Sequence, residues 1–216
     1  MEIRDKAETV KIAVLYSIEQ EMQRVLYTIK RLPWYTEQGY SATHITIPSG
    51  ITEDSTDEDV AQVVNAEFLS EDYVLYATKL EEEWRIIAGG FEKMRVEPSF
   101  HLKNEYGVVL TKYGMGGSYD ADASVAIIKM NTQSQGGSAG TVVHEIMHMT
   151  IQHLIDQYHV RHWYKERLVD LLMERYFPGL KKTQTIKEDV SIVDRAFEKF
   201  FPNMDAITQS IGKSEL

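Results

Sequence analysis

The first part of the chain carries strand-like and helix-like patterns in turn. Apolar residues recur at spacings of three and four from Ile18 to Ile29, which predicts one buried face of a helix, and Pro33 is expected to end it. Residues 10–16 fit either a strand or part of this helix, since periodicity does not decide between the two. Residues 40–48 alternate and are rich in β-branched side chains, so they predict a short strand.

Two helices are predicted next. Ser55 and Glu58, in an acidic segment, have the spacing of a capping box, which predicts a helix over about residues 56–68. We interpret the acidic side chains as a solvated helix start, with a calcium site as the alternative. A second helix is predicted over residues 71–87, and the pair of glycines at residues 89 and 90 is expected to end it.

The middle of the chain changes to a strand pattern. Residues 91–96, 106–111 and 123–130 are predicted to form antiparallel strands. The glycine-rich residues 113–120 lack the lysine and the helix of a phosphate-binding loop. We therefore interpret them as a hairpin loop or as the rim of a cleft.

The last third is predicted to be helical. Proline is absent from residues 99–177, so a pair of helices there is unbroken, and residues 189–200 form one more amphipathic helix. We predict a single α+β domain over residues 1–216, with a small antiparallel or mixed sheet. Two lobes are the most that this length supports: residues 1–136, mixed α/β, and residues 137–216, helical.

Composition narrows the classes of function. The net charge of −10 argues against a nucleic-acid partner, and the absence of cysteine excludes disulfides and thiolate metal sites. No stretch approaches the length of a membrane span, and the first residues have no apolar signal region. We expect a cytoplasmic protein without a membrane partner, although a secreted mature form would look the same. The oligomeric state stays open.

The strongest chemical signal is an H-E-x-x-H motif formed by His144, Glu145 and His148. On a helix the two imidazoles lie about 6 Å apart along the axis and about 40° apart around it, so they can share a metal ion. Glu145 is turned by about 100° and can face a metal-bound water without being a ligand. Neutral imidazoles suit zinc. The alternative is a buried helix with two hydrogen-bonded histidines and an acid.

The residues after His148 bear on the third ligand. Ile151 and Leu154 occupy the positions where a metzincin has glycine and histidine, which excludes that class. Glu166 follows His148 by 18 residues, and with Asp170 it forms an E-x-x-x-D pattern. The two motifs together resemble the gluzincins, the thermolysin-like clan of zinc peptidases. The resemblance covers about residues 124–176, a quarter of the chain.

The resemblance implies a zincin-like fold and one zinc ion per chain. His144, His148 and Glu166 would be its ligands, Asp170 would accept a hydrogen bond from a ligand imidazole, and Glu145 would be the general base of peptide hydrolysis. On one straight helix Glu166 would lie about 27 Å from His148, so the chain must reverse near residues 155–161. Glu174 is the reserve ligand. Alternatively, Glu166 is only part of a charged helix face.

Gluzincins also have an edge strand before the metal helix, which pairs with the extended backbone of the substrate. By resemblance this role falls to Ala126, Ile127, Ile128, Lys129 and Met130. The competing interpretation is an interior strand whose neighbours are already in place.

The family's downstream Tyr or His, which stabilises the oxyanion, is not matched. The only such residue after Glu166 is Tyr176, about 15 Å farther along the same helix. The candidates for this role are therefore His159, His162, Tyr164, Tyr119 and Tyr113.

Three functions fit these patterns. The first is a zinc peptidase acting on a peptide or protein substrate. The second is a non-catalytic metal-binding protein of the same fold with a regulatory or interaction role. The third is a helical binding module in which the motif is coincidental. The E-x-x-x-D pattern favours the first two, and the unmatched oxyanion residue favours the second.

Overall fold

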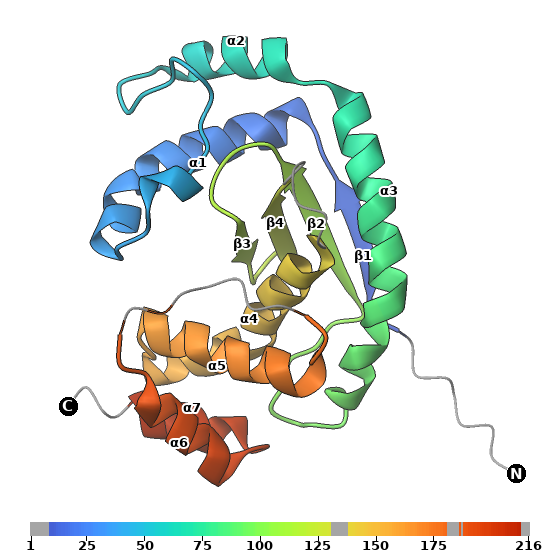
Figure 1. Ribbon diagram of the computed structural model, residues 1–216, viewed down its shortest axis with the longest axis vertical. Coiled ribbons are helices and arrows are strands. Elements are labelled where there is room, and N and C mark those ends of the chain that lie inside the picture. The colour runs from blue at the N-terminus through green and yellow to red at the C-terminus, as the bar shows by residue number, and fades with distance from the viewer. Residues whose placement is uncertain (1–8, 131–137, 181–185, 187, 213–216) are drawn as a thin grey trace, which may run out of the picture.

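The computed structural model describes residues 9–130, 138–180, 186 and 188–212. A four-stranded mixed sheet forms its centre (Figure 1). Its strands are β1 (Lys11–Leu15), β2 (Glu105–Thr111), β3 (Gly117–Asp120) and β4 (Val125–Lys129). They lie in the order β1-β2-β4-β3, with β1, β2 and β4 parallel and β3 antiparallel to β4. The predicted α+β class with a small sheet is confirmed, and the predicted antiparallel pairing of β2 is wrong.

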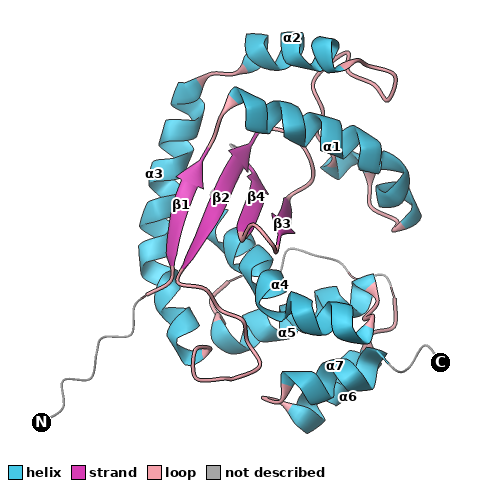
Figure 2. Ribbon diagram, turned by 180° about the vertical axis from the view of Figure 1, so that it is seen from behind, coloured by secondary structure: helices cyan, strands magenta, loops and turns pink. Residues whose placement is uncertain are grey.

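Helices surround this sheet (Figures 1 and 2). They are α1 (Ile18–Glu37), α2 (Asp57–Glu67), α3 (Ser70–Ile87), α4 (Ser138–Tyr158), α5 (His162–Tyr176), α6 (Ser191–Phe200) and α7 (Met204–Gly212), with 3₁₀ helices at Ala42–His44 and Ala88–Lys93. None of the described helices is long and apolar enough to cross a membrane.

Burial alternates along β4, so one face of the sheet is fully covered and the other is partly exposed. Ala126 and Ile128 are fully buried, whereas Val125, Ile127 and Lys129 are half-buried. The buried side chains belong to one large apolar cluster, to which the sheet and helices α3 to α7 all contribute. A second, smaller cluster lies between α1 and α2. The predicted boundary between two lobes falls at residues 131–137, outside the described residues.

Helix α1 crosses the carboxyl ends of β1 and β2. A carboxylate oxygen of Glu21 accepts a hydrogen bond from the backbone N–H of Lys112, at 2.6 Å, just after β2 ends. The helix does not stop at Pro33, as predicted, but continues to Glu37. Proline inside a helix removes one backbone hydrogen bond and crowds the carbonyl of the residue four positions earlier, which can kink the helix without ending it.

Two predicted strands are absent. Residues 40–48 contain the 3₁₀ helix Ala42–His44 and a single bridge between Thr46 and Gly114. Residues 91–96 overlap the 3₁₀ helix Ala88–Lys93 and the turn after it, and Phe91 and Met94 are both fully buried. These two side chains are three residues apart, which places them on one side of a 3₁₀ turn. The apolar spacing there was helical.

Helices α2 and α3 lie close to their predicted ranges. Helix α2 begins one residue later than the predicted capping box: Thr56 and Asp59 form the reciprocal bonds instead of Ser55 and Glu58. Ser55 instead accepts a hydrogen bond from the backbone N–H of Thr52. Helix α3 matches its predicted range within one residue.

Candidate metal centre and cleft

The chain reverses between α4 and α5 without a glycine. His159 takes up a left-handed conformation with φ of 51°. The N–H of Val160 donates to the carbonyl of Ile155 at 3.0 Å, and that of His159 donates to Asp156 at 3.4 Å, which together form a Schellman motif. The reversal lies where the sequence required it and brings α5 alongside the metal-motif helix.

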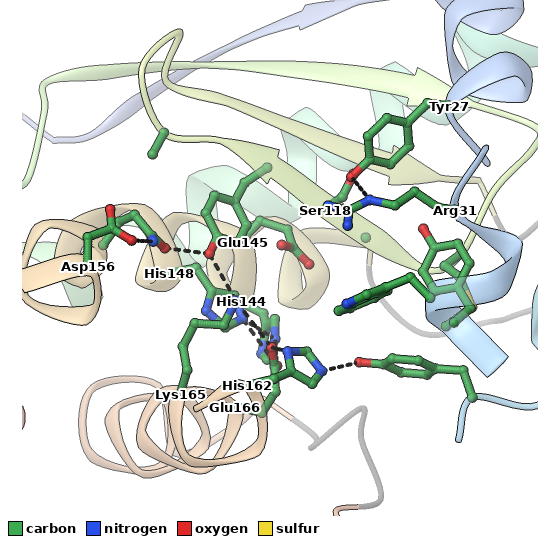
Figure 3. A pocket seen from close by; sticks show the side chains of 18 of the residues that line it. Tyr27, Arg31, Ser118, His144, Glu145, His148, Asp156, His162, Lys165 and Glu166 are labelled. Atoms are coloured by element: carbon green, nitrogen blue, oxygen red, sulfur yellow. Dashed lines mark hydrogen bonds and ion pairs between the residues drawn. The ribbon is translucent and has the colours of Figure 1, made fainter. Parts of the chain in front are cut away.

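Three donor atoms from α4 and α5 converge (Figure 3). Nε2 of His144 lies 3.0 Å from Nε2 of His148. Oε2 of Glu166 lies 3.2 Å from the His148 nitrogen and 3.3 Å from the His144 nitrogen. Ligands about 2.0–2.1 Å from a tetrahedral zinc ion are separated by about 3.3–3.4 Å. The buried triad can therefore hold a metal ion.

The protonation states of His148 and Glu166 suit metal binding, whereas the pKa of His144 is raised, against the effect of burial, by its hydrogen bond with Glu166 and by nearby carboxylates. Burial lowers the pKa of His148 to about 3, so its imidazole is neutral. Burial also opposes the charge of Glu166, but His148 and His144 outweigh it and hold the pKa of that carboxyl well below its usual range. The triad thus combines a neutral imidazole with an ionised carboxylate, which are the forms that coordinate metals.

The positions of Asp170 and Glu174 show which side of α5 faces the triad. Asp170 is buried, and its charge is among those that raise the pKa of His144 against the effect of burial. Asp170 therefore lies near a ligand imidazole. Glu174 has a side chain that is 48% exposed and pairs with Arg167 at 3.8 Å. The prediction of Glu174 as a reserve ligand is therefore wrong, because this residue lies on the outer side of α5.

Glu145 lies beside the triad in the same cleft. Burial raises the pKa of its carboxyl to about 7. The cleft above it holds about 460 Å³ and is lined by residues of α1, α4, α5 and the segment around β3. Gly117 of β3 lies directly against this carboxylate, and a Cβ atom there would overlap Oε1 of Glu145.

The edge strand beside the cleft is β3, not β4. Strand β4 lies between β2 and β3, so the predicted edge role of residues 126–130 is wrong. The fully buried Ala126 and Ile128 suit an interior strand. Strand β3 comes from the glycine-rich segment, which was predicted as a loop or rim. Tyr119 of β3 stacks on the ring of His148, with centroids 5.0 Å apart.

A buried arginine of α1 holds this segment in place. Arg24 donates hydrogen bonds to Oγ of Ser118 at 2.8 Å and to the carbonyls of Met115 and Tyr113 at 3.0 and 3.4 Å. Gly114, with φ of 95°, packs against the guanidinium. This role could not be predicted from the sequence, because an arginine on an amphipathic helix is usually solvated.

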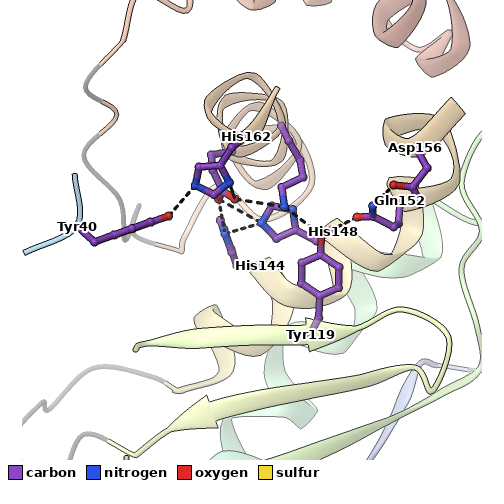
Figure 4. A network of polar contacts seen from close by, with 9 residues as sticks. Tyr40, Tyr119, His144, His148, Gln152, Asp156 and His162 are labelled. Carbon is purple, nitrogen blue, oxygen red and sulfur yellow. Dashed lines mark hydrogen bonds and ion pairs between the residues drawn. The ribbon is translucent and has the colours of Figure 1, made fainter. Parts of the chain in front are cut away.

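A chain of polar contacts continues from the triad across the cleft (Figure 4). Nζ of Lys165 lies 3.7 Å from Oε1 of Glu166 and donates to the hydroxyl of Tyr119 at 3.1 Å. That hydroxyl donates to Oε1 of Gln152 at 2.6 Å, and the Gln152 amide donates to Asp156 at 2.7 Å. The Tyr119 proton is therefore directed at Gln152.

The predicted oxyanion candidates separate into two groups. Tyr119 and His162 line the cleft. His159 is exposed in the turn, Tyr164 is buried beneath Arg161, and Tyr113 donates its hydroxyl hydrogen to Glu67. None of these three is among the cleft residues.

Tyr176 packs on Phe100 and Phe201 and likewise does not line the cleft. Tyr40, placed in a predicted strand by its sequence, lines the cleft and bonds to Nε2 of His162 at 2.8 Å.

In comparisons of this chain with family models, curated proteins and solved structures, nothing matched.

Proposed function

We propose that this protein is a zinc-dependent peptidase of the gluzincin type with a zincin-like fold. The observation that carries the proposal is the convergence of His144, His148 and Glu166 beside Glu145 at the floor of a cleft. These three ligands would hold one zinc ion. When bound, zinc lowers the pKa of a water molecule and polarises a carbonyl group.

Glu145 is proposed as the general base. Its carboxylate shares the cleft with the triad but takes no part in it. A pKa of about 7 lets the carboxylate accept a proton from water and return it to the leaving amine near neutral pH. Gly117 leaves no room for the carboxylate to turn toward β3.

Strand β3 is proposed to bind the backbone of the substrate. The N–H of Lys129 donates to the carbonyl of Gly116 at 2.8 Å, which fixes the alternation of the β3–β4 pair. The backbone groups of Gly117 and Tyr119 then point away from β4. An extended peptide can pair with these two residues and lie over Glu145 and the triad.

Lys165 is proposed to supply the positive charge that the oxyanion requires. The Tyr119 hydroxyl already donates to Gln152, whereas the ammonium of Lys165 has three N–H donors and gives one to Tyr119. Tyr119 and Glu166 hold this ammonium beside the triad. A fixed cation at this point stabilises developing negative charge without reorganisation.

Metal content and hydrolysis together test the proposal. We expect about one zinc ion per purified chain, retained in Glu174→Ala and lost in Glu166→Ala. Glu174→Ala is the matched control, because it removes the same carboxylate from the outer side of α5. Glu145→Gln should keep the metal and lose hydrolysis of a peptide library. Full hydrolysis by Glu145→Gln would rule out the proposed mechanism.

A further inference from the structure

A second arginine of α1 lies in the cleft and is not used by the proposed reaction. Tyr27, Arg31 and Trp34 have the spacing i, i+4, i+7, which places them on one face of the helix. All three line the cleft, and Figure 3 shows Arg31 and Tyr27 across from the triad. This face forms the wall opposite α5.

The guanidinium of Arg31 is oriented but not neutralised. Its Nε donates to the hydroxyl of Tyr27 at 3.0 Å. Its Cζ lies 5.0 Å from the centre of the Trp34 ring and 5.4 Å from that of Tyr27. No ion pair joins it to any residue within the described ranges. Arg24, two turns earlier, is by contrast buried and donates to three acceptors.

The guanidinium is also within reach of the metal centre. The Trp34 ring touches His162, with centroids 5.3 Å apart, and Nδ1 of His162 lies 3.7 Å from Oε1 of Glu166. Two rings therefore separate Arg31 from the triad. This separation is no more than about five extended residues of a peptide.

We propose that Arg31 is the binding site for a carboxylate of the substrate. This inference rests on the proposed function in taking the substrate to be a peptide. The two terminal nitrogens of a guanidinium match the two oxygens of a carboxylate. The contacts with Tyr27 and Trp34 hold the guanidinium plane in one orientation. The carboxylate is either the C-terminus of a short peptide or an acidic side chain near the scissile bond.

The overall charge makes a directed contact necessary. The chain carries a net charge of −10, so its average field repels an anionic ligand. The cleft also contains acidic residues, among them Asp122 and Asp156. A carboxylate increases the affinity of a ligand for this cleft only where it pairs with a specific cation. Lys165 pairs with Glu166 and is assigned to the oxyanion, which leaves Arg31 as the other arginine or lysine among the described residues that line the cleft.

Calorimetric titration of the full chain, purified with its metal and carrying Glu145→Gln, tests this site. Three N-acetylated peptides of one length are compared: a free C-terminus, a C-terminal amide, and a C-terminal amide with one glutamate. At least one carboxylate peptide is expected to bind about 10-fold or more tightly than the neutral amide. A gain with the free C-terminus identifies that source, and a gain with glutamate alone identifies the side chain.

Three variants in the same background decide whether Arg31 is responsible. Arg31→Gln should abolish the preference, and Arg31→Lys should retain only part of it, since it keeps the charge without the fork. Lys30→Gln removes the same charge from an exposed neighbour outside the cleft and should keep the preference.

Equal binding of the three peptides, or a preference that survives Arg31→Gln or disappears in Lys30→Gln, would overturn the inference. The titration needs no turnover. A failure of wild-type hydrolysis would therefore reject the proposed function while leaving a carboxylate preference measurable.

Discussion

Gly117 of β3 packs so closely over Glu145 of α4 that a Cβ atom at residue 117 would overlap Oε1 of the carboxylate. The strand proposed to bind the substrate and the proposed general base are thus in direct contact. No side chain larger than hydrogen fits between them.

Gly117→Ala is therefore expected to displace the Glu145 carboxylate and to lower the rate of peptide hydrolysis by about 100-fold, since a shift of about 1 Å in a catalytic group has this effect. Zinc content should not change. Gly116→Ala is the matched control, because a Cβ there meets nothing within 4 Å. Equal rates for the two variants would mean that Glu145 tolerates the displacement.

Arg24→Met is expected to lower the free energy of unfolding by about 2–4 kcal/mol, measured by urea denaturation. The Ser118 hydroxyl and the Met115 carbonyl lose the hydrogen bonds that Arg24 donates, while the Tyr113 carbonyl keeps the bond from the Thr111 hydroxyl at 3.0 Å. Lys30→Met, on the exposed side of the same helix, should change stability by less than about 0.5 kcal/mol. A similar small effect of Arg24→Met would show that the segment does not depend on this anchor.

Lys165→Met is expected to lower kcat by about 100- to 1,000-fold with little change in KM, because the ammonium acts on charge that develops during the reaction. Tyr119→Phe should have a smaller effect, since it removes only a contact that positions Lys165. The metal content of both variants is measured alongside the kinetics. If Tyr119→Phe were as impaired as Lys165→Met, the phenol would be the group that meets the oxyanion.

Glu21 gives a prediction for pH. Burial raises the pKa of this carboxyl above its ordinary value of 4.5, against the opposing effect of hydrogen bonds from Tyr73 and the Lys112 backbone. The folded state therefore binds the proton more tightly than the unfolded state does. The contribution of Glu21 to stability is present below pH 4.5 and is lost as the pH rises through the raised pKa.

Glu21→Gln removes this titration. The difference in unfolding free energy, wild type minus Glu21→Gln, is expected to fall as the pH increases from about 4.5 toward neutrality. Urea denaturation of both proteins at several pH values measures it. A difference that rises with pH would mean that the hydrogen bonds to the ionised form dominate.

The sequence predicted the grouping of His144, His148 and Glu166 better than the sheet and loops around it. The spacing of His144, His148 and Glu166 depends on two helices and one reversal, all close together in the chain, so local patterns were enough. The reversal itself carried no signal, because His159 occupies a position that usually selects glycine.

The errors concern contacts between distant segments. Strand β3 is glycine-rich and has little strand propensity of its own, and its pairing with β4 makes it a strand. Which strand lies at an edge depends on neighbours that periodicity does not reveal. Likewise, the roles of Arg24, Tyr40 and Gln152 arise from partners elsewhere in the chain, so their residue types alone gave no indication.

The contact between Arg24 and Ser118 joins distant parts of the chain, which has a consequence for how the protein folds. Arg24 and Ser118 are 94 residues apart in the chain, whereas His148 and Glu166 are separated by only 18. Closing the longer loop costs more entropy. The metal ligands belong to a local helical hairpin, whereas the wall that completes the cleft depends on non-local contacts. Metal affinity and peptide binding are expected to be lost at separate stages when the chain is unfolded.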